Sequence, residues 1–176
     1  MSILQTFEQH PSFLHFSIGL LGLLVGSFLN VVVYRLPIML QRSWRKECLE
    51  FLEQEETKPP SPEVFNLSQP RSRCPFCNHS ITALENIPVL SYLLLKGKCK
   101  NCKKPISIRY PIVELTTALF SVLITLHFGV SLQTVAALLF TWTLICLTLI
   151  DFDTQLLPDS ITLPLLWFAL LASLFH

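Results

Sequence analysis

The chain has 176 residues, of which 51% are hydrophobic and 14% are charged, and its mean hydropathy is +0.53. This composition argues against an ordinary soluble domain and indicates a membrane protein. The net charge of +1 carries little information, but its distribution does, because all 13 Lys and Arg residues lie between Arg35 and Arg109.

The first apolar segment covers residues 13–36, and it can cross about 30 Å of hydrocarbon at about 1.5 Å per residue. Its basic residues follow the apolar run, whereas a cleaved signal peptide carries them before it. We therefore expect a retained transmembrane segment over residues 1–36. Gly22 and Gly26 should let another helix approach closely, and the Asn30 amide should find a hydrogen-bond partner.

Residues 37–109 form a polar region. Within it, residues 41–56 are expected to form a short amphipathic helix with a solvated acidic face, which includes the four glutamates between positions 50 and 56. A Pro-rich stretch after Lys58 predicts an extended linker over residues 57–70. A cysteine module then occupies residues 71–109.

Two Cys-x-x-Cys pairs define this module, and 21 residues separate them: Cys74, Cys77, Cys99 and Cys102. Such pairs place four thiolates around one zinc ion, in a closed structural site with no open position for water. A disulfide or redox role is the alternative, which a cytosolic location disfavours. The Lys and Arg residues around the cysteines favour thiolates and could also attract anionic lipid. Since the module is tethered to a membrane, we expect no nucleic-acid partner.

Three more apolar segments follow the module. The second covers residues 110–130 and carries Glu114 near its start, and a tight turn near Gly129 leads into the third, which is uncharged over residues 131–150. The fourth begins at Ser160, and because the chain ends inside it we expect a truncated chain. The sequence thus predicts a mainly α fold with about four membrane helices, the last cut short, and a zinc module between the first two.

The positions of the basic residues predict the orientation. The polar region flanks the first and second segments, so the positive-inside tendency places it in the cytoplasm and the amino terminus in the periplasm. The third segment then returns to the cytoplasmic face, where it delivers Asp151 on the same side as the cysteine module.

Asp151, Asp153 and Asp159 lie within nine residues, between two apolar runs. A carboxylate at such a junction is costly and is a functional candidate. Aspartic proteases use two Asp residues that share one proton, but Asp151 and Asp159 would lie roughly 12 Å apart along one helix. We interpret Asp151 as one catalytic acid. The alternatives are a solvated loop acid for Asp153 and an N-cap of the fourth helix for Asp159.

Together these residues resemble the type IV prepilin peptidases, which are bifunctional leader peptidases and N-methyltransferases of bacterial inner membranes. The resemblance extends over both cysteine pairs and over the following stretches: Gly-Ser-Phe-Leu-Asn-Val-Val-Val-Tyr-Arg-Leu-Pro at 26–37, Glu-Asn-Ile-Pro at 85–88, Gly-Lys-Cys at 97–99, Arg-Tyr-Pro-Ile-Val-Glu at 109–114, and 151–159.

The resemblance implies that the enzyme cleaves the basic leader of type IV prepilins or secretion pseudopilins after a glycine, and then methylates the new amino terminus with S-adenosylmethionine. It also implies that Asp151 is the first catalytic aspartate and that residues 131–176 begin the peptidase membrane domain. The second aspartate belongs to a Gly-x-Gly-Asp motif, which these 176 residues do not contain. We therefore expect the chain alone to be inactive.

For methyl transfer, the resemblance makes Gly97 and Glu114 candidates. The alternatives are a turn glycine for Gly97 and an acid paired with Arg109 for Glu114. For the chain as a whole, the competing interpretations are a non-catalytic membrane protein whose zinc module serves assembly, and a redox-active thiol protein. Beyond prepilins or pseudopilins, the expected partner is membrane lipid.

Overall fold

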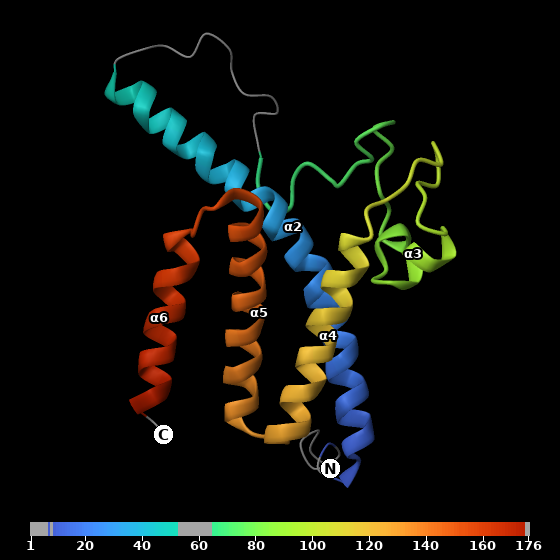
Figure 1. Cartoon of the computed structure of the whole chain (residues 1–176), viewed down its shortest axis with the longest axis vertical. Helices are drawn as coiled ribbons and strands as arrows, with labels where there is room; N and C mark the ends of the chain where they lie inside the picture. The colour runs from blue at the N-terminus through green and yellow to red at the C-terminus, as the bar shows by residue number, and fades with distance from the viewer. Residues whose placement is uncertain (1–6, 8, 53–64, 175–176) are drawn as a thin grey trace.

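The computed structural model describes residues 7, 9–52 and 65–174, and within these ranges it consists of helices and loops without a β-strand (Figure 1). Four helices make up most of the chain: α2 (Pro11–Phe51), α4 (Arg109–Phe128), α5 (Leu132–Thr154) and α6 (Asp159–Leu174). Between α2 and α4 lie the short elements η1 (Leu84–Asn86) and α3 (Leu90–Leu94). The predicted mainly α fold is confirmed.

Three of these helices, α2, α4 and α5, are long and apolar enough to cross a membrane, and α6 is a shorter apolar helix. The 20 residues of α4 span about 30 Å, which is close to the thickness of the hydrocarbon core. Successive helices run in opposite directions, and α6 lies on the outer side of α5 (Figure 1). This arrangement is consistent with a membrane protein.

Helix α2 differs from the expectation, because it does not end near residue 36. It continues through Pro37 to Phe51, so residues 41–51 are helical as predicted, but they extend the first helix and do not form a separate one. Proline removes one intrahelical hydrogen bond and bends a helix without necessarily ending it, and the outer part of α2 leans away from the bundle (Figure 1). The acidic residues 53–56 and positions 57–64 of the predicted linker lie outside the described residues.

The predicted close approach at the glycines of α2 is confirmed. A Cβ atom on Gly22 would lie 2.7 Å from Cα of Ala118, and one on Gly26 would lie 2.7 Å from Cα of Glu114. Both distances are too short for any real side chain, so only glycine lets the backbones of α2 and α4 come this close. One turn further on, the Asn30 amide donates to the carbonyl of Tyr110 (3.2 Å), which is the partner this polar group requires.

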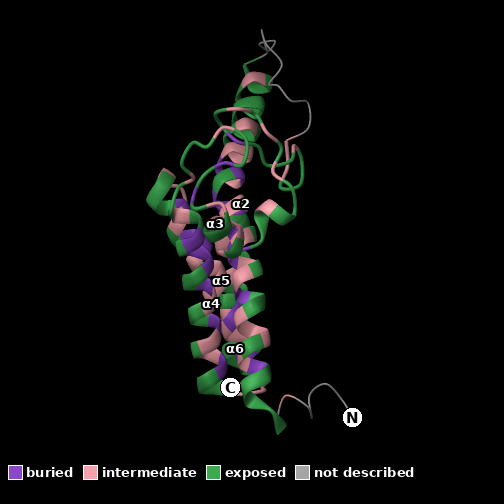
Figure 2. Cartoon of the chain, turned by 90° about the vertical axis from the view of Figure 1, so that its right-hand side faces the viewer, coloured by how far each residue is buried: buried purple, intermediate pink, exposed green. Residues whose placement is uncertain are grey.

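A small core joins α2 to α5 near the zinc-module end of the bundle. It contains five buried residues: Leu29, Val32, Val33, Cys146 and Ile150. Most large apolar side chains on the outer surfaces of the helices are exposed, and the buried positions lie between the helices (Figure 2). A bilayer would cover these outer surfaces with hydrocarbon.

The predicted turn between α4 and α5 is also confirmed. Gly129 follows α4 with φ +60°, a conformation that costs glycine little. Ser131 then caps α5, since its hydroxyl accepts a hydrogen bond from the amide of Thr134 (3.2 Å). This turn makes α4 and α5 antiparallel neighbours.

The helix contact predicts unequal effects of alanine at two glycines. Gly26→Ala and Gly19→Ala should both gain about 1 kcal/mol of helix propensity. At Gly26 the new methyl group meets backbone and should force α2 and α4 apart, at a cost of about 1–3 kcal/mol. At Gly19 it meets only the Val122 side chain at 3.3 Å, which can shift. Thermal unfolding in detergent should therefore show a lower Tm for Gly26→Ala and an unchanged or higher Tm for Gly19→Ala; equal shifts would contradict the contact.

Candidate functional site

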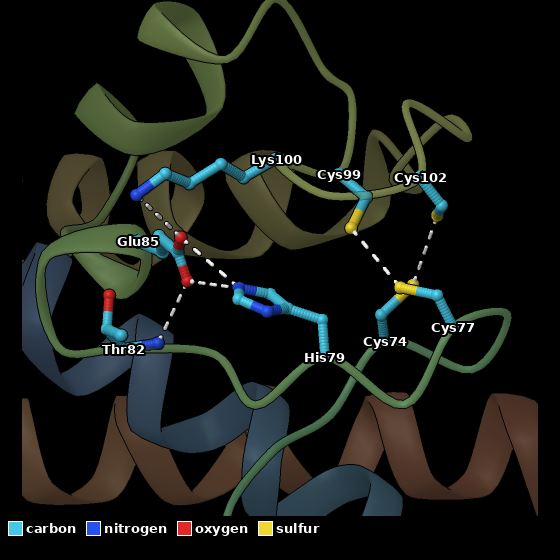
Figure 3. A network of polar contacts seen from close by, with 8 residues as sticks. All are labelled: Cys74, Cys77, His79, Thr82, Glu85, Cys99, Lys100 and Cys102. Carbon is cyan, nitrogen blue, oxygen red and sulfur yellow. Dashed lines mark hydrogen bonds and ion pairs between the residues drawn. The ribbon is translucent and has the colours of Figure 1, made fainter.

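The four cysteines of the module come together as the sequence predicts. Their sulfur atoms all lie within 4.8 Å of one another. The Sγ atoms of Cys74 and Cys102 are 3.8 Å apart, and those of Cys77 and Cys99 are 3.9 Å apart. A disulfide needs sulfurs at about 2.05 Å, so these are free thiols. Figure 3 shows them pointing toward one another from two separate loops.

The two loops share one backbone design. In the first, the amide of Asn78 donates to the Cys74 carbonyl (3.0 Å), and Asn78 has φ +55°. In the second, the amide of Lys103 donates to the Cys99 carbonyl (3.0 Å), and Lys103 has φ +59°. Isolated β-bridges, Arg73 with Ser80 and Lys98 with Pro105, close the two loops. Each loop is therefore a knuckle that presents two sulfurs to the same point.

This donor set fits zinc. Four ligands at the usual Zn–S distance of about 2.3 Å form a tetrahedron with edges of about 3.8 Å, which matches the 3.8 and 3.9 Å separations of these two pairs of sulfurs. The Lys104 amide donates to Cys102 and lowers its pKa, but burial and the neighbouring sulfurs outweigh this and raise the pKa to about 11. Four thiolates at these distances therefore need a cation, and Cys74, Cys77, Cys99 and Cys102 could hold zinc.

Glu85 connects the two knuckles, a role the sequence did not reveal (Figure 3). Its Oε2 accepts from the Thr82 amide (3.0 Å) and lies 3.1 Å from Nε2 of His79, which belongs to the first knuckle. Its Oε1 lies 3.4 Å from Nζ of Lys100 in the second knuckle. The Thr82 amide, together with His79 and Lys100, lowers the pKa of Glu85 to about 2. The sequence held one indication of this role, because Glu85 is the single acidic residue between positions 65 and 108, a range that contains seven Lys and Arg residues.

Arg35 fixes α2 to the segment that enters the module. Its side chain is buried, and its guanidinium donates to the carbonyls of Asn66 (2.8 Å) and Pro70 (2.6 Å). Phe65 lies between Arg35 and Arg42, which are 5.7 and 4.4 Å from the centre of its ring. Arg35 entered the sequence prediction only as a charge that sets orientation, and its structural role was missed.

Asp151 lies in the last turn of α5, at the end of the bundle that carries the zinc module (Figure 1). The preceding Ile150 is completely buried, and Asp151 itself is exposed. Within the described residues its carboxylate has no hydrogen bond or ion pair, and only its backbone carbonyl is engaged, by the amide of Gln155. A rigid helix thus presents a free carboxylate at this end of the bundle.

Asp153 and Arg109 form an ion pair, with Nη1 and Oδ1 2.7 Å apart. This pair joins the last turn of α5 to the first turn of α4. Asp153 is exposed, but it lies in a helix and is ion-paired, so it is not a loop acid. The partner of Arg109 is Asp153 and not Glu114, which contradicts that alternative. Asp159 begins α6, where a carboxylate interacts favourably with the helix dipole.

Glu114 is buried in α4 and accepts a hydrogen bond from the amide of Val89 (2.7 Å). Val89 has φ +59°, which is strained for a β-branched residue. The carboxylate therefore holds the start of α3 against α4. Gly97 has φ +66°, and a Cβ atom there would lie 2.9 Å from the Tyr92 ring, so this position occupies a turn that only glycine fits.

Among the described residues, the contacts of Gly97 and Glu114 do not indicate a site for S-adenosylmethionine. Tyr92 fills the space above Gly97, and the buried Glu114 carboxylate is already engaged by Val89. No step of methyl transfer therefore follows from this geometry. The assignment of Gly97 and Glu114 to that activity stays a prediction.

Comparison with known proteins identifies relatives along nearly the whole chain. Residues 20–128 match the family described as "Bacterial Peptidase A24 N-terminal domain", and residues 138–176 match the "Type IV leader peptidase family". The prepilin leader peptidase/N-methyltransferase of Aeromonas salmonicida (strain A449) is 51% identical over 175 residues, which are 99% of this chain and 60% of that protein. Its namesake in Stutzerimonas stutzeri is 56% identical over 155 residues, which are 88% of this chain and 53% of that protein.

The chain therefore spans 53–60% of the length of these curated relatives. No solved structure matches it significantly.

The thiol cluster predicts that replacing one of its cysteines removes the bound metal, whereas replacing a cysteine outside it does not. The purified chain should contain about one zinc per molecule, as four thiolates bind one ion, and Cys74→Ser or Cys102→Ser should lose most of it. Cys48→Ser, at an exposed cysteine outside the cluster, is the matched control and should keep its zinc. Elemental analysis by mass spectrometry measures the content. Unchanged zinc in Cys74→Ser would contradict the site.

The Glu85 network predicts faster release of zinc to a chelator in Glu85→Gln, because the amide carries no charge for His79 and Lys100. Glu50→Gln, at the exposed pair with Lys46, should behave like wild type. The folded-state pKa of about 2 lies below the ordinary value of 4.5, so the stabilisation is present above pH 4.5 and is lost as pH falls toward 2. Glu85 therefore stays ionised between pH 7 and about pH 5, and the variant should release zinc faster than wild type at both ends of this range; equal release rates at either pH would contradict the network.

Proposed function

The chain belongs to the bacterial A24 family of type IV leader peptidases, and from this premise we propose that it acts in prepilin leader cleavage, with Asp151 as a catalytic aspartate. The observation that carries the proposal is the exposed carboxylate of Asp151, which has no partner among the described residues and lies beside the fully buried Ile150. A carboxylate held at a fixed place and free of competing cations can take a proton from an attacking water molecule.

The proposed chemistry is of the aspartic type, in which two carboxylates share one proton. Asp153 does not serve as the second acid, because Arg109 holds it in an ion pair. Asp159 lies beyond Pro158 in the first turn of the next helix, and among the described residues no hydrogen bond joins it to Asp151. In the family pattern the second acid comes from a Gly-x-Gly-Asp motif, and we expect cleavage to require a segment that carries this motif.

The proposed substrate is a type IV prepilin or a secretion pseudopilin, whose basic leader precedes a long apolar helix. Such a substrate lies in the bilayer with its cleavage site at the membrane surface, and Asp151 lies at one end of an apolar helix. By the positive-inside tendency this end is cytoplasmic, the membrane is the bacterial inner membrane, and the start of α2 is periplasmic. Zinc held by the four cysteines is structural in this proposal, because all four positions are taken by protein sulfur.

Methylation of the new amino terminus is the second part of the proposal, with S-adenosylmethionine as methyl donor. It rests on the names of the relatives, which describe them as N-methyltransferases as well as leader peptidases. Gly97 and Glu114 remain its candidate residues. The alternative of a non-catalytic assembly factor is not favoured, since both parts of the chain match peptidase families.

The test joins residues 1–176 to the carboxyl-terminal part of the Aeromonas salmonicida relative that they do not cover. In membrane vesicles this fusion should cleave a prepilin, and Asp151→Asn should lower the rate by about 10²–10⁴-fold or more, because an amide cannot accept the proton. Asp159→Asn is the control and should stay active. The shift in prepilin mass on gel electrophoresis measures cleavage, and labelled S-adenosylmethionine in the same mixture reports methyl transfer.

The outcomes are distinct. Cleavage by Asp151→Asn would contradict the catalytic role of Asp151. An inactive wild-type fusion that is correctly inserted would contradict the peptidase proposal. Turnover by residues 1–176 alone would show that no second acid from a Gly-x-Gly-Asp segment is needed.

A further inference from the structure

The elements η1 and α3 carry an apolar surface that no described part of the chain covers. Its side chains are large and strongly exposed: Leu84 (78%), Leu90 (58%), Leu93 (64%) and Leu94 (81%). We call these four residues the leucine face. Leu90, Leu93 and Leu94 share one face of α3 by their three- and four-residue spacing, and η1, which carries Leu84, contacts α3. Clustered exposed apolar side chains of this kind mark a site of contact with a membrane or another molecule.

The position of α3 along α4 indicates that the leucine face contacts a membrane. The amide of Val89, the residue before α3, is bonded to Glu114. Glu114 lies five residues into α4, about 7.5 Å along the helix from Arg109. Since the 20 residues of α4 are just long enough for the hydrocarbon core, its first turns cannot stand far above the membrane. The start of α3 is therefore held at the depth of the interface.

Charge supports the same conclusion. Residues 65–108 contain seven Lys and Arg residues and a single acid, Glu85, which is already paired. Lys96 and Lys98 follow directly after α3 and are exposed. An apolar surface bordered by lysines is the composition of a segment that lies in the surface of an anionic bilayer, with its leucines among the acyl chains and its ammonium groups at the phosphates.

We propose that η1 and α3 form an interfacial anchor, in which the leucine face dips into the adjacent leaflet beside α4 and Lys96 and Lys98 contact anionic phospholipid headgroups. The module is then held to the membrane at two places, by the Glu114–Val89 bond inside the protein and by lipid outside it. The anchor depends on α4 spanning a bilayer and does not depend on peptidase activity.

The test uses photocrosslinking of the full chain in nanodiscs that contain phosphatidylglycerol. Benzoylphenylalanine replaces one side chain at a time, at positions that are exposed already, so that folding is not disturbed. Leu94 reports the leucine face, Leu119 on α4 (56% exposed) is the lipid-facing reference, and Phe51 at the outer end of α2 (87% exposed) is the aqueous reference. Intact-mass spectrometry after irradiation detects the added mass of one phospholipid.

The expected result is a phospholipid adduct at Leu94 and at Leu119, with none at Phe51. In discs of neutral phosphatidylcholine, or in the Lys96→Gln/Lys98→Gln variant, the yield at Leu94 should fall while the yield at Leu119 stays the same. A lipid adduct at Leu119 without one at Leu94 would overturn the anchor, as would an adduct at Leu94 to a second copy of the chain or to an added prepilin in place of lipid. Absence of lipid at Leu119 would also overturn it, because the depth argument requires α4 in the bilayer.

Discussion

The close contact of α2 and α4 at Gly22 and Gly26 is the constraint on which the other features depend. It brings the backbone of Glu114 against α2, so that the Glu114 carboxylate is buried and needs a donor. The Val89 amide meets this need, and α3 is thereby docked on the membrane helices. A larger residue at Gly26 would move α4 and with it Arg109, whose bond to Asp153 holds the end of α5.

Hydrogen bonds between distant parts of the chain join the module to the membrane helices at two places, and a third joins two of the helices to each other. Arg35 binds the backbone at positions 66 and 70, and Glu114 binds Val89; Asn30 of α2 binds the carbonyl of Tyr110 in α4. In each case a polar side chain of a membrane helix satisfies a backbone group of another segment. Such hydrogen bonds are favoured where little water is available, and they give the exposed Asp151 carboxylate a defined position relative to the knuckles.

Features set by local sequence could be predicted, and features set by pairing across the chain could not. The uncharged runs predicted the apolar helices, because hydrophobicity can be read from a single segment. The cysteine spacing predicted the thiol cluster, because the number of metal ligands can be counted in the same way. The end of the apolar run placed the end of the first segment at residue 36, yet α2 continues through Pro37 to Phe51. Arg109 was paired with the nearby Glu114, but its true partner is 44 positions away, and no pattern within one helix carries that information.

The repeated form of the knuckles has a consequence for how the protein matures. Each supplies only two of four sulfurs, so neither can hold an ion tightly before the other arrives, and Glu85 likewise needs His79 from one and Lys100 from the other. Assembly of this region would then be all-or-none, set by the supply of a metal ion that all four thiolates bind together. Without such an ion the apolar helices would keep their own backbone hydrogen bonds, whereas the two knuckles would lack their common centre.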